Sequence, residues 1–217
     1  DEESRQAAVR YWKRAIQLAA LLGVDTMNSE FNGNPRAAEV CEAQFWRSME
    51  ELLPVFDKEG IRLVLEPHPD DFEEDGKRAI DLIKALNSDN VSFLYCTPHT
   101  FHQGNDVDGI LDKAGPLTTM CHLADAFDHT ASSGLRYIVN PPGSQVTVHQ
   151  HLDMGQGEVD FDRFFAAVDA IVSIDDISGR VAKSDLVPNQ VVVSDMFVEA
   201  TAAEAASSFA DNLIKIQ

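Results

Sequence analysis

The chain has 217 residues, of which 44% are hydrophobic, and its 36 acidic and 17 basic side chains give a net charge of −19. This composition fits one soluble globular domain over residues 1–217, and the acidic charge argues against a nucleic-acid partner because it repels phosphate backbones. We expect no membrane span, since no apolar run approaches the ~20 residues that a bilayer requires. The three isolated cysteines fit reduced thiols and a cytoplasmic location.

The predicted elements alternate between helices and strands. Apolar side chains at helical spacing predict helices over 3–22 and 36–59, the second kinked or broken at Pro54. Further helices are expected over 77–86, 107–114, 159–171 and 202–216, and strands over 24–27, 61–66, 91–96, 117–123 and 190–194. This alternation is typical of a parallel sheet with crossover helices, which leaves open a doubly wound sheet or the later part of a barrel.

The predicted strand 61–66 ends in chemically active side chains. Because side chains alternate between the two faces of a strand, Val64, Glu66 and His68 share one face. An acid and an imidazole therefore lie side by side at the carboxyl end of the strand, where parallel α/β folds carry their chemistry. We take Glu66 and His68 as candidate catalytic residues, with a structural carboxylate and a surface imidazole as the alternatives.

Two later predicted strands also run into metal-ligating side chains: Val91–Cys96 leads into His99 and His102, and Leu117–Cys121 leads into His122 and Asp125. Carboxylate oxygens and imidazole nitrogens from separate strands are typical ligands of a divalent cation. The sequence therefore predicts a metal site formed by Glu66, by one of His99 and His102, and by His122, which Asp195 at the end of the last predicted strand could complete. Asp195 could instead cap the following helix, and we expect Cys96 and Cys121 to be small buried hydrophobic side chains.

The long loop over 126–158 is expected to contribute to the site, because loops of that length inside a compact domain are usually functional or disordered. His149 and His151 alternate along this loop, so only one of them can face the site if the segment is extended. The predicted substrate contacts are Glu30, His102, Asp125, Arg136 and His151. Asp125 could also orient His122, or simply begin the loop.

Taken together, these residues resemble the xylose-isomerase-like superfamily of sugar isomerases and epimerases, and in particular its inositol-catabolism branch. The likeness lies in Leu65-Glu66-Pro67-His68-Pro69, in a D-x-x-H-like element at the next strand, in His122-Leu123-Ala124-Asp125 and in the stretch Gly155–Phe161. The resemblance implies an α/β fold, the (β/α)8 TIM barrel, of which this chain would contain about the fourth to the eighth strand and lack the first strands.

The resemblance also implies a divalent cation, with Mn²⁺ as the first candidate and Mg²⁺, Co²⁺ or Zn²⁺ as alternatives. Glu66 and His122 match the ligand pattern of the family. The acid of the sixth strand is replaced by Cys96 or His99, and we favour His99 because the following Thr-Phe-His run then matches as well. Asp195 stands where the family has a glutamate. Since two glutamates move the proton in ordinary epimerases of the family, these departures argue against a simple epimerase mechanism.

The function that the resemblance implies is a metal-dependent isomerase or epimerase that acts on a sugar, keto sugar or inositol derivative through an enediolate. One alternative is the catalytic subunit of a C-glycoside deglycosidase acting on 3-keto glycosides, and another is a barrel that binds a polyol without turnover. A DNA repair nuclease is disfavoured by the charge. The expected partners are a small sugar or polyol substrate and either a second copy of the chain or a heteromeric partner subunit.

Overall fold

The computed structural model describes residues 1–102, 104, 106–127, 138–139, 147–148, 151–168, 180–182 and 197–199. The chain divides into two compact units, residues 1–159 and residues 160–217. Whether 1–217 acts as the single domain expected from the sequence stays a prediction.

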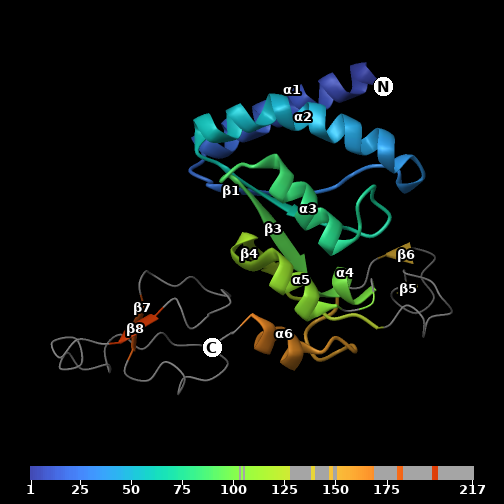
Figure 1. Cartoon of the computed structure of the whole chain (residues 1–217), viewed down its shortest axis with the longest axis vertical. Helices are drawn as coiled ribbons and strands as arrows, with labels where there is room; N and C mark the ends of the chain where they lie inside the picture. The colour runs from blue at the N-terminus through green and yellow to red at the C-terminus, as the bar shows by residue number, and fades with distance from the viewer. Residues whose placement is uncertain are drawn as a thin grey trace. The chain divides into compact units, whose positions relative to one another are not determined.

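The first unit contains a four-stranded parallel sheet whose strands follow one another in chain order: β1 (Thr26–Glu30), β2 (Arg62–Glu66), β3 (Val91–Cys96) and β4 (Thr118–His122). The helices of this unit are α1 (Glu2–Leu21), α2 (Ala38–Glu59), α3 (Gly76–Leu86), α4 (Thr97–His102) and α5 (Val107–Ala114), with short 3-10 turns at Pro35–Ala37 and Gly115–Leu117. Figure 1 shows α1 and α2 running along each other. Sequential parallel strands joined by helices are what the predicted part of a (β/α)8 barrel requires.

The bounds predicted for the first strand were wrong, and the second helix is continuous where the sequence allowed a kink or a break. Strand β1 covers Thr26–Glu30 rather than 24–27, because pairing with β2 extends it through residues whose polar side chains gave no strand pattern. The helix α2 runs through Pro54 without a break. Pro54 and Glu50 are both exposed, so the carbonyl oxygen that proline leaves without a backbone donor can be hydrated.

The remaining elements differ from the expected strand–helix alternation. Within the predicted loop 126–158, the short strands β5 (Ile138–Val139) and β6 (Thr147–Val148) pair antiparallel. In the second unit, α6 covers Phe161–Ala167 rather than 159–171, since the side chain of Asp160 caps its first turn. The strands β7 (Arg180–Ala182) and β8 (Phe197–Glu199) also pair antiparallel. The strand predicted over 190–194 and the helix over 202–216 lie outside the described residues.

Two layers of side chains lie on one face of the parallel sheet. The first is apolar and contains Val64, Leu94 and Met120, one from each of β2, β3 and β4. Side chains alternate along a strand, so the second layer comes two residues later on each strand. It consists of Glu66, Cys96 and His122, the last residues of those strands. The apolar layer therefore forms a floor beneath the chemically active one.

The start of α4 is tied to the segment after β4, which fixes the two strand ends relative to each other. The buried Thr97 hydroxyl donates to the carbonyl oxygen of Ala124 at 2.7 Å, and the backbone N–H of Ala124 donates back to the hydroxyl at 3.0 Å. Because Thr97 follows Cys96 directly, these hydrogen bonds hold the end of β3 beside the chain that leaves His122.

The carboxylate of Asp125 holds the segment that carries His151. Its backbone forms an antiparallel bridge with Leu152, and its side chain accepts hydrogen bonds from the backbone N–H groups of Gly155 (2.9 Å) and Val159 (3.0 Å). Gly157 is required here, because a Cβ atom at that position would collide with the Asp125 carboxylate. The backbone from Gly155 to Val159 therefore closes this segment around a buried acid.

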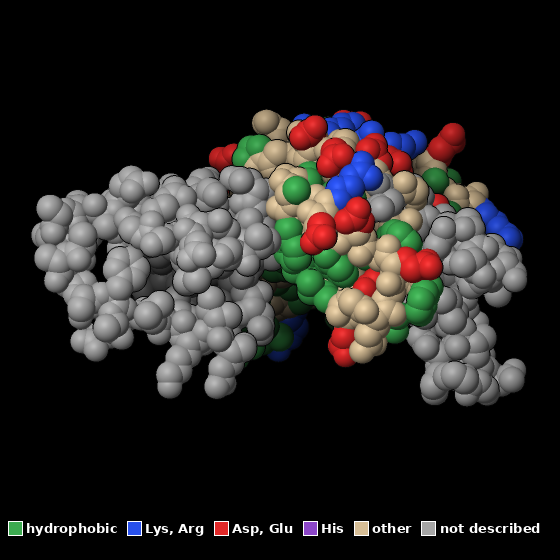
Figure 2. Space-filling view, turned by 90° about the horizontal axis from the view of Figure 1, so that it is seen from below, with side chains coloured by type: hydrophobic (Ala, Val, Ile, Leu, Met, Phe, Trp, Pro, Cys, Tyr) green, Lys and Arg blue, Asp and Glu red, His purple; other side chains and the backbone are tan. Residues whose placement is uncertain are grey.

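The described surface is acidic, as the composition indicates. Figure 2 shows one face of the molecule, on which Asp and Glu side chains lie among apolar and polar ones. None of the helices in the described ranges combines the length and the apolar character needed to cross a membrane.

Replacing Asp125 with Asn should lower the free energy of unfolding at pH 7 by roughly 2–3 kcal/mol, the scale of hydrogen bonds to a buried charge. The amide keeps one acceptor oxygen but turns its NH₂ group toward backbone N–H donors. Chemical denaturation measures the loss. The exposed Asp153→Asn, on the same segment, is the control and should change stability by less than about 0.5 kcal/mol.

The same pair of variants should also show a defined pH dependence. Burial raises the pKa of Asp125, but the backbone N–H groups of Val159, Gly157, Ala126 and Gly155 outweigh burial and lower it. A carboxyl with a lowered pKa stabilises the fold above its unfolded value, about 3.9, and loses that contribution as the pH falls through the folded value. The stability gap between the wild type and Asp125→Asn should narrow in acid, and a gap independent of pH would contradict this account.

Candidate metal centre

Glu66 lies at the centre of the candidate site. Its carboxylate is buried, with Oε1 at 2.9 Å from Nδ1 of His99 and Oε2 at 3.2 Å from Nδ1 of His122. Three different elements supply these side chains: the end of β2, the helix α4 and the end of β4. The geometric expectation from the sequence, that Glu66, His99 and His122 lie close together, therefore holds in the structure.

Cys96 completes the same layer. It is the Cα partner of His122 in the β3–β4 register. The ligand atoms of Glu66, Cys96 and His122 all lie within 4.8 Å of one another, as do those of Cys96, His99 and His151. The thiol is thus common to two groups of metal-ligating side chains.

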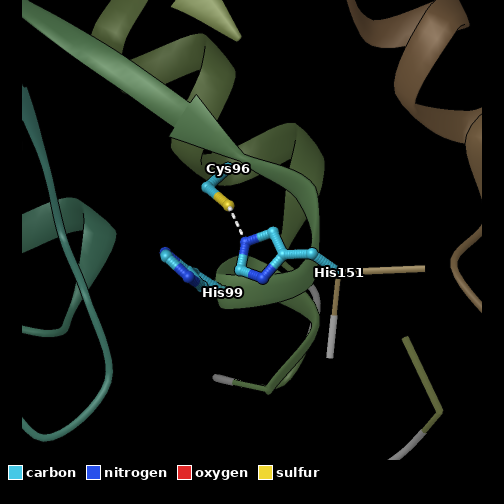
Figure 3. Close-up of side chains that lie close together, drawn as sticks. All are labelled: Cys96, His99 and His151. Atoms are coloured by element: carbon cyan, nitrogen blue, oxygen red, sulfur yellow. Dashed lines mark hydrogen bonds between the residues drawn. The ribbon is translucent and has the colours of Figure 1, made fainter. Parts of the chain in front are cut away.

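His151 reaches this cluster from the segment that Asp125 holds. Its Nε2 lies 3.7 Å from the sulfur of Cys96, and its ring meets that of His99 edge-on, with centroids 5.2 Å apart. Figure 3 shows Cys96 at the end of the strand arrow, His99 on the helix that follows it and His151 entering from a separate segment. Residues more than fifty positions apart in the sequence thereby meet at one point.

The electrostatics of the cluster reflect this crowding. Burial raises the pKa of Glu66, but the contact with His99 and the positive charge available on His99 and His122 outweigh burial and lower it. Burial, together with the charge of Glu66, raises the pKa of Cys96 well above its usual range. Desolvation and the neighbouring His99 lower the pKa of His151. The metal-free cluster therefore favours an ionised carboxylate, a neutral thiol and a neutral His151.

The side chains gathered around Cys96 form the first group, namely Glu66, Cys96, His99, His122 and His151. A second group lies next to it and consists of Glu30, His68 and Asp71, whose ligand atoms also fall within 4.8 Å of one another. The ring of His68 meets that of His99 edge-on at 4.6 Å, and its Nε2 lies 4.0 Å from Oε1 of Glu30. Its Nδ1 lies 2.8 Å from the carbonyl oxygen of Pro69. A carbonyl oxygen only accepts, so we assign the ring proton to Nδ1, which leaves Nε2 of the neutral ring as the basic atom.

The loop that follows β2 brings Asp71 into this second group. Phe72 anchors that loop by packing edge-on against Phe31, with ring centroids 5.8 Å apart, and by donating its backbone N–H to the Phe31 carbonyl oxygen at 3.3 Å. One oxygen of the Asp71 carboxylate is buried. Burial raises the pKa of Asp71 to about 6, against the opposing effect of His68.

The predicted site residues divide into three sets. The structure brings together Glu66, His68, His99, His122, Glu30 and His151. Asp125 is not among them, because backbone N–H groups engage its buried carboxylate and use it to hold the loop, and its predicted contact with a substrate stays a prediction. Three predicted positions lie outside the described part of the chain: the side chain of His102, Arg136 and Asp195.

Sequence reasoning missed Asp71 and set Cys96 aside. Cys96 was weighed against His99 as the replacement for the acid of the sixth strand, but His99 was favoured and the thiol was expected to be a small buried hydrophobic side chain. Its place as the last residue of a strand, like that of Glu66, was a usable signal. Asp71 lies in a loop so rich in acids that no single carboxylate stood out. Only the packing of Phe72 against Phe31 selects it.

The donors of the first group fit a divalent metal ion. Oε1 of Glu66 is buried and makes no hydrogen bond of proper geometry, even though Nδ1 of His99 lies 2.9 Å away. Carboxylate, imidazole and thiol donors gathered around one point are the ligand types that transition metals take in proteins. Of the groups found among the described residues, this one joins buried carboxylate, imidazole and thiol donors, and it is the one that we take as the candidate metal centre.

The family model for the xylose isomerase-like TIM barrel matches residues 1–175. That match covers most of the chain, so the chain belongs to this family. No curated protein sequence matches closely enough to count as a relative.

Several solved structures share the fold. The IolI protein with a bound zinc atom is 20% identical with a TM-score of 0.61, and the match covers 77% of this chain and 57% of that one. The D-allulose 3-epimerase from Methylomonas sp. is 19% identical with a TM-score of 0.54, over 74% and 51% of the two chains. The 3-keto-D-glucoside 4-epimerase YcjR from E. coli is 18% identical with a TM-score of 0.55, over 77% and 60%. This chain spans between about half and three fifths of their length.

Asp71→Asn should stabilise the protein at neutral pH by about 1 kcal/mol, a figure that allows for solvent screening of a partly buried charge. Because the folded pKa of Asp71, about 6, lies above the unfolded value, the stabilisation from its neutral form is lost as the pH rises toward about 6. The gain in the variant should therefore grow between about pH 4 and pH 6 and then level off.

Thermal unfolding of the two proteins across that pH range checks this prediction. The exposed Asp89→Asn is the control for the loss of one negative charge from the acidic surface. An equal gain in both variants would mean that net charge, and not burial of Asp71, is responsible.

Proposed function

We propose that this member of the xylose isomerase-like TIM-barrel family forms the metal-binding and proton-transfer part of an isomerase or epimerase that acts on a sugar, keto sugar or inositol derivative. The observation that supports the proposal most strongly is the pairing of two neighbouring groups. One of them, Glu66, Cys96 and His122, is suited to hold a cation, and the other contains His68, which is suited to move a proton. Epimerases among the structural neighbours support the same class of reaction.

His68 is the proton acceptor in this proposal. Its ring is about one quarter exposed, which leaves it accessible to a substrate, and its Nε2 is the basic atom when Nδ1 donates to Pro69. Histidine titrates near neutral pH, so a neutral ring is available to remove a proton from a carbon next to a carbonyl group. The product of that removal is an enediolate, and return of the proton to either face or to the neighbouring carbon gives epimerisation or isomerisation.

Glu66 serves as a ligand rather than as the base. Its side chain is about 4% exposed and lies between His99 and His122, so its oxygens are not directed to an open surface. This assignment separates the two roles that the sequence left combined. When bound, the cation would polarise the substrate carbonyl and stabilise the negative charge that develops as the proton leaves.

Glu30 lies where it can bind a substrate hydroxyl. It is the last residue of β1 and the Cα partner of Glu66 in the β1–β2 register, and its side chain is 38% exposed. The side-chain amide of Asn32 donates to its Oε2 at 3.0 Å, which holds the carboxylate beside His68. A carboxylate next to an imidazole can accept a hydroxyl proton and also stabilise the protonated ring.

Cleavage of a 3-keto glycoside is the second candidate. The number of imidazoles favours it, since His68, His99 and His151 contact one another in a row next to the ligand layer. A histidine base adjacent to a cation can also remove the proton next to a 3-keto group and so expel an aglycone. The two candidates share the first chemical step and differ in what leaves the substrate.

His68→Ala should abolish exchange of the substrate C–H proton with solvent deuterium while the protein still binds metal. The measurement is proton NMR of the metal-loaded full chain in D₂O with ketohexoses, inososes and 3-keto glycosides, alongside elemental analysis for bound metal. We expect a loss of at least about 100-fold in the exchange rate, the usual contribution of a general base.

Arg62→Ala is the matched control, because Arg62 is exposed at the opposite end of the same strand, and its exchange rate should equal that of the wild type. Exchange that persists in His68→Ala would remove His68 from the mechanism. Metal binding without exchange on any substrate would favour a barrel that binds a polyol without turnover, and release of an aglycone would favour the second candidate.

A further inference from the structure

The position of Cys96 has a consequence for the choice of metal. Cys96 is the last residue of β3, as Glu66 is of β2 and His122 is of β4. All three stand two residues beyond the apolar layer, and Cys96 is itself packed on that layer with Val64 and Leu94. A side chain at this position points to the same place as the acid and the imidazole on the neighbouring strands.

We infer that Cys96 is a thiolate ligand and that the centre selects a thiophilic divalent ion, such as Zn²⁺ or Co²⁺, over Mn²⁺ or Mg²⁺. The inference rests on the proposed metal centre and adds which metal ions that centre prefers. It replaces the expectation of Mn²⁺, which came from the resemblance to the family. The family has an acidic ligand at the strand that corresponds to β3, and this chain has none at the end of that strand.

The geometry around the sulfur supports this inference. The sulfur belongs to both groups of ligand atoms that lie within 4.8 Å of one another, with Glu66 and His122 on one side and His99 and His151 on the other. His151 contacts it directly at 3.7 Å. The two groups together offer one carboxylate, one sulfur and three imidazoles, which is enough to supply the four donors that a tetrahedral zinc ion takes.

Ligand chemistry gives the direction of the selectivity. Soft thiolates favour zinc and similar ions, whereas Mn²⁺ and Mg²⁺ favour carboxylate, carbonyl and water oxygens. Among the described side chains of the first group, Glu66 alone supplies carboxylate oxygen, while sulfur and imidazole nitrogen supply the rest. A set with so little oxygen disfavours the hard ions.

Cys121 is a cysteine that lies outside the ligand layer. It is half-buried on β4, next to His122. It belongs to none of the groups of metal-ligating side chains found among the described residues. Cys121 is therefore the matched control for Cys96, since the two thiols lie on adjacent strands and differ in the face that they occupy.

The test is cobalt titration of the metal-free full chain, followed by absorption spectroscopy. In the wild type and in Cys121→Ser we expect a sulfur-to-cobalt charge-transfer band in the near ultraviolet. In Cys96→Ser that band should be lost. In Cys96→Asp, competition between Zn²⁺ and Mn²⁺ should shift toward Mn²⁺ by at least about tenfold, a change that even outer-shell partners of a metal can cause.

The wild type alone also decides the question if a variant fails to fold. X-ray absorption of the zinc-loaded protein should show one sulfur neighbour at about 2.3 Å. Cobalt or zinc bound without sulfur would overturn the inference and leave the proposed metal centre standing. A charge-transfer band that persists in Cys96→Ser would also overturn it. Absence of bound metal would overturn both proposals.

Discussion

The site depends on the alternation of side chains along three adjacent parallel strands. Because every second residue faces the same way, one apolar layer, Val64, Leu94 and Met120, fixes where the next layer must lie. That next layer is the last residue of each strand, where the backbone is still held by the sheet but the side chain is near the open end. The apolar layer excludes water from one side of the cluster, and the strands hold the side chains of the cluster in rigid positions, as a metal centre requires.

Within this frame, the buried charge of Glu66 governs the surrounding residues. An isolated carboxylate with so little exposure would be strongly disfavoured, and the two imidazoles within about 3 Å compensate for it. The chain therefore brings His99 on a helix and His122 on a strand to opposite oxygens of the same group. His68 and His151 then meet the ring of His99 edge-on, so the position of that ring links the layer of Glu66, Cys96 and His122 to the group that contains His68.

The sequence predicted the parts of this arrangement in which the pattern of apolar residues along the chain agrees with the burial of those residues in the fold. The strands β2 and β3 consist mostly of apolar residues, and their ends identified Glu66 and the neighbouring histidines. Strand β1 was misplaced because its Thr-Met-Asn-Ser-Glu sequence carries no periodic signal, and only pairing with β2 makes it a strand. Distances such as that from Cys96 to His151 could not be predicted, since they arise from the loop that Asp125 closes.

The difference between Cys96 and Asp125 shows why residue type alone could not decide the role of either. Asp125 has the chemistry of a ligand, but its carboxylate oxygens accept hydrogen bonds from the surrounding backbone N–H groups. It therefore helps to hold the fold. Cys96 has the size of a small core residue, but its register with His122 puts it in the ligand layer. The role that we infer for a side chain at this site therefore follows from its position in the strand register. If sulfur replaces an oxygen ligand at the end of β3, as we infer, the register stays the same while the preferred metal changes.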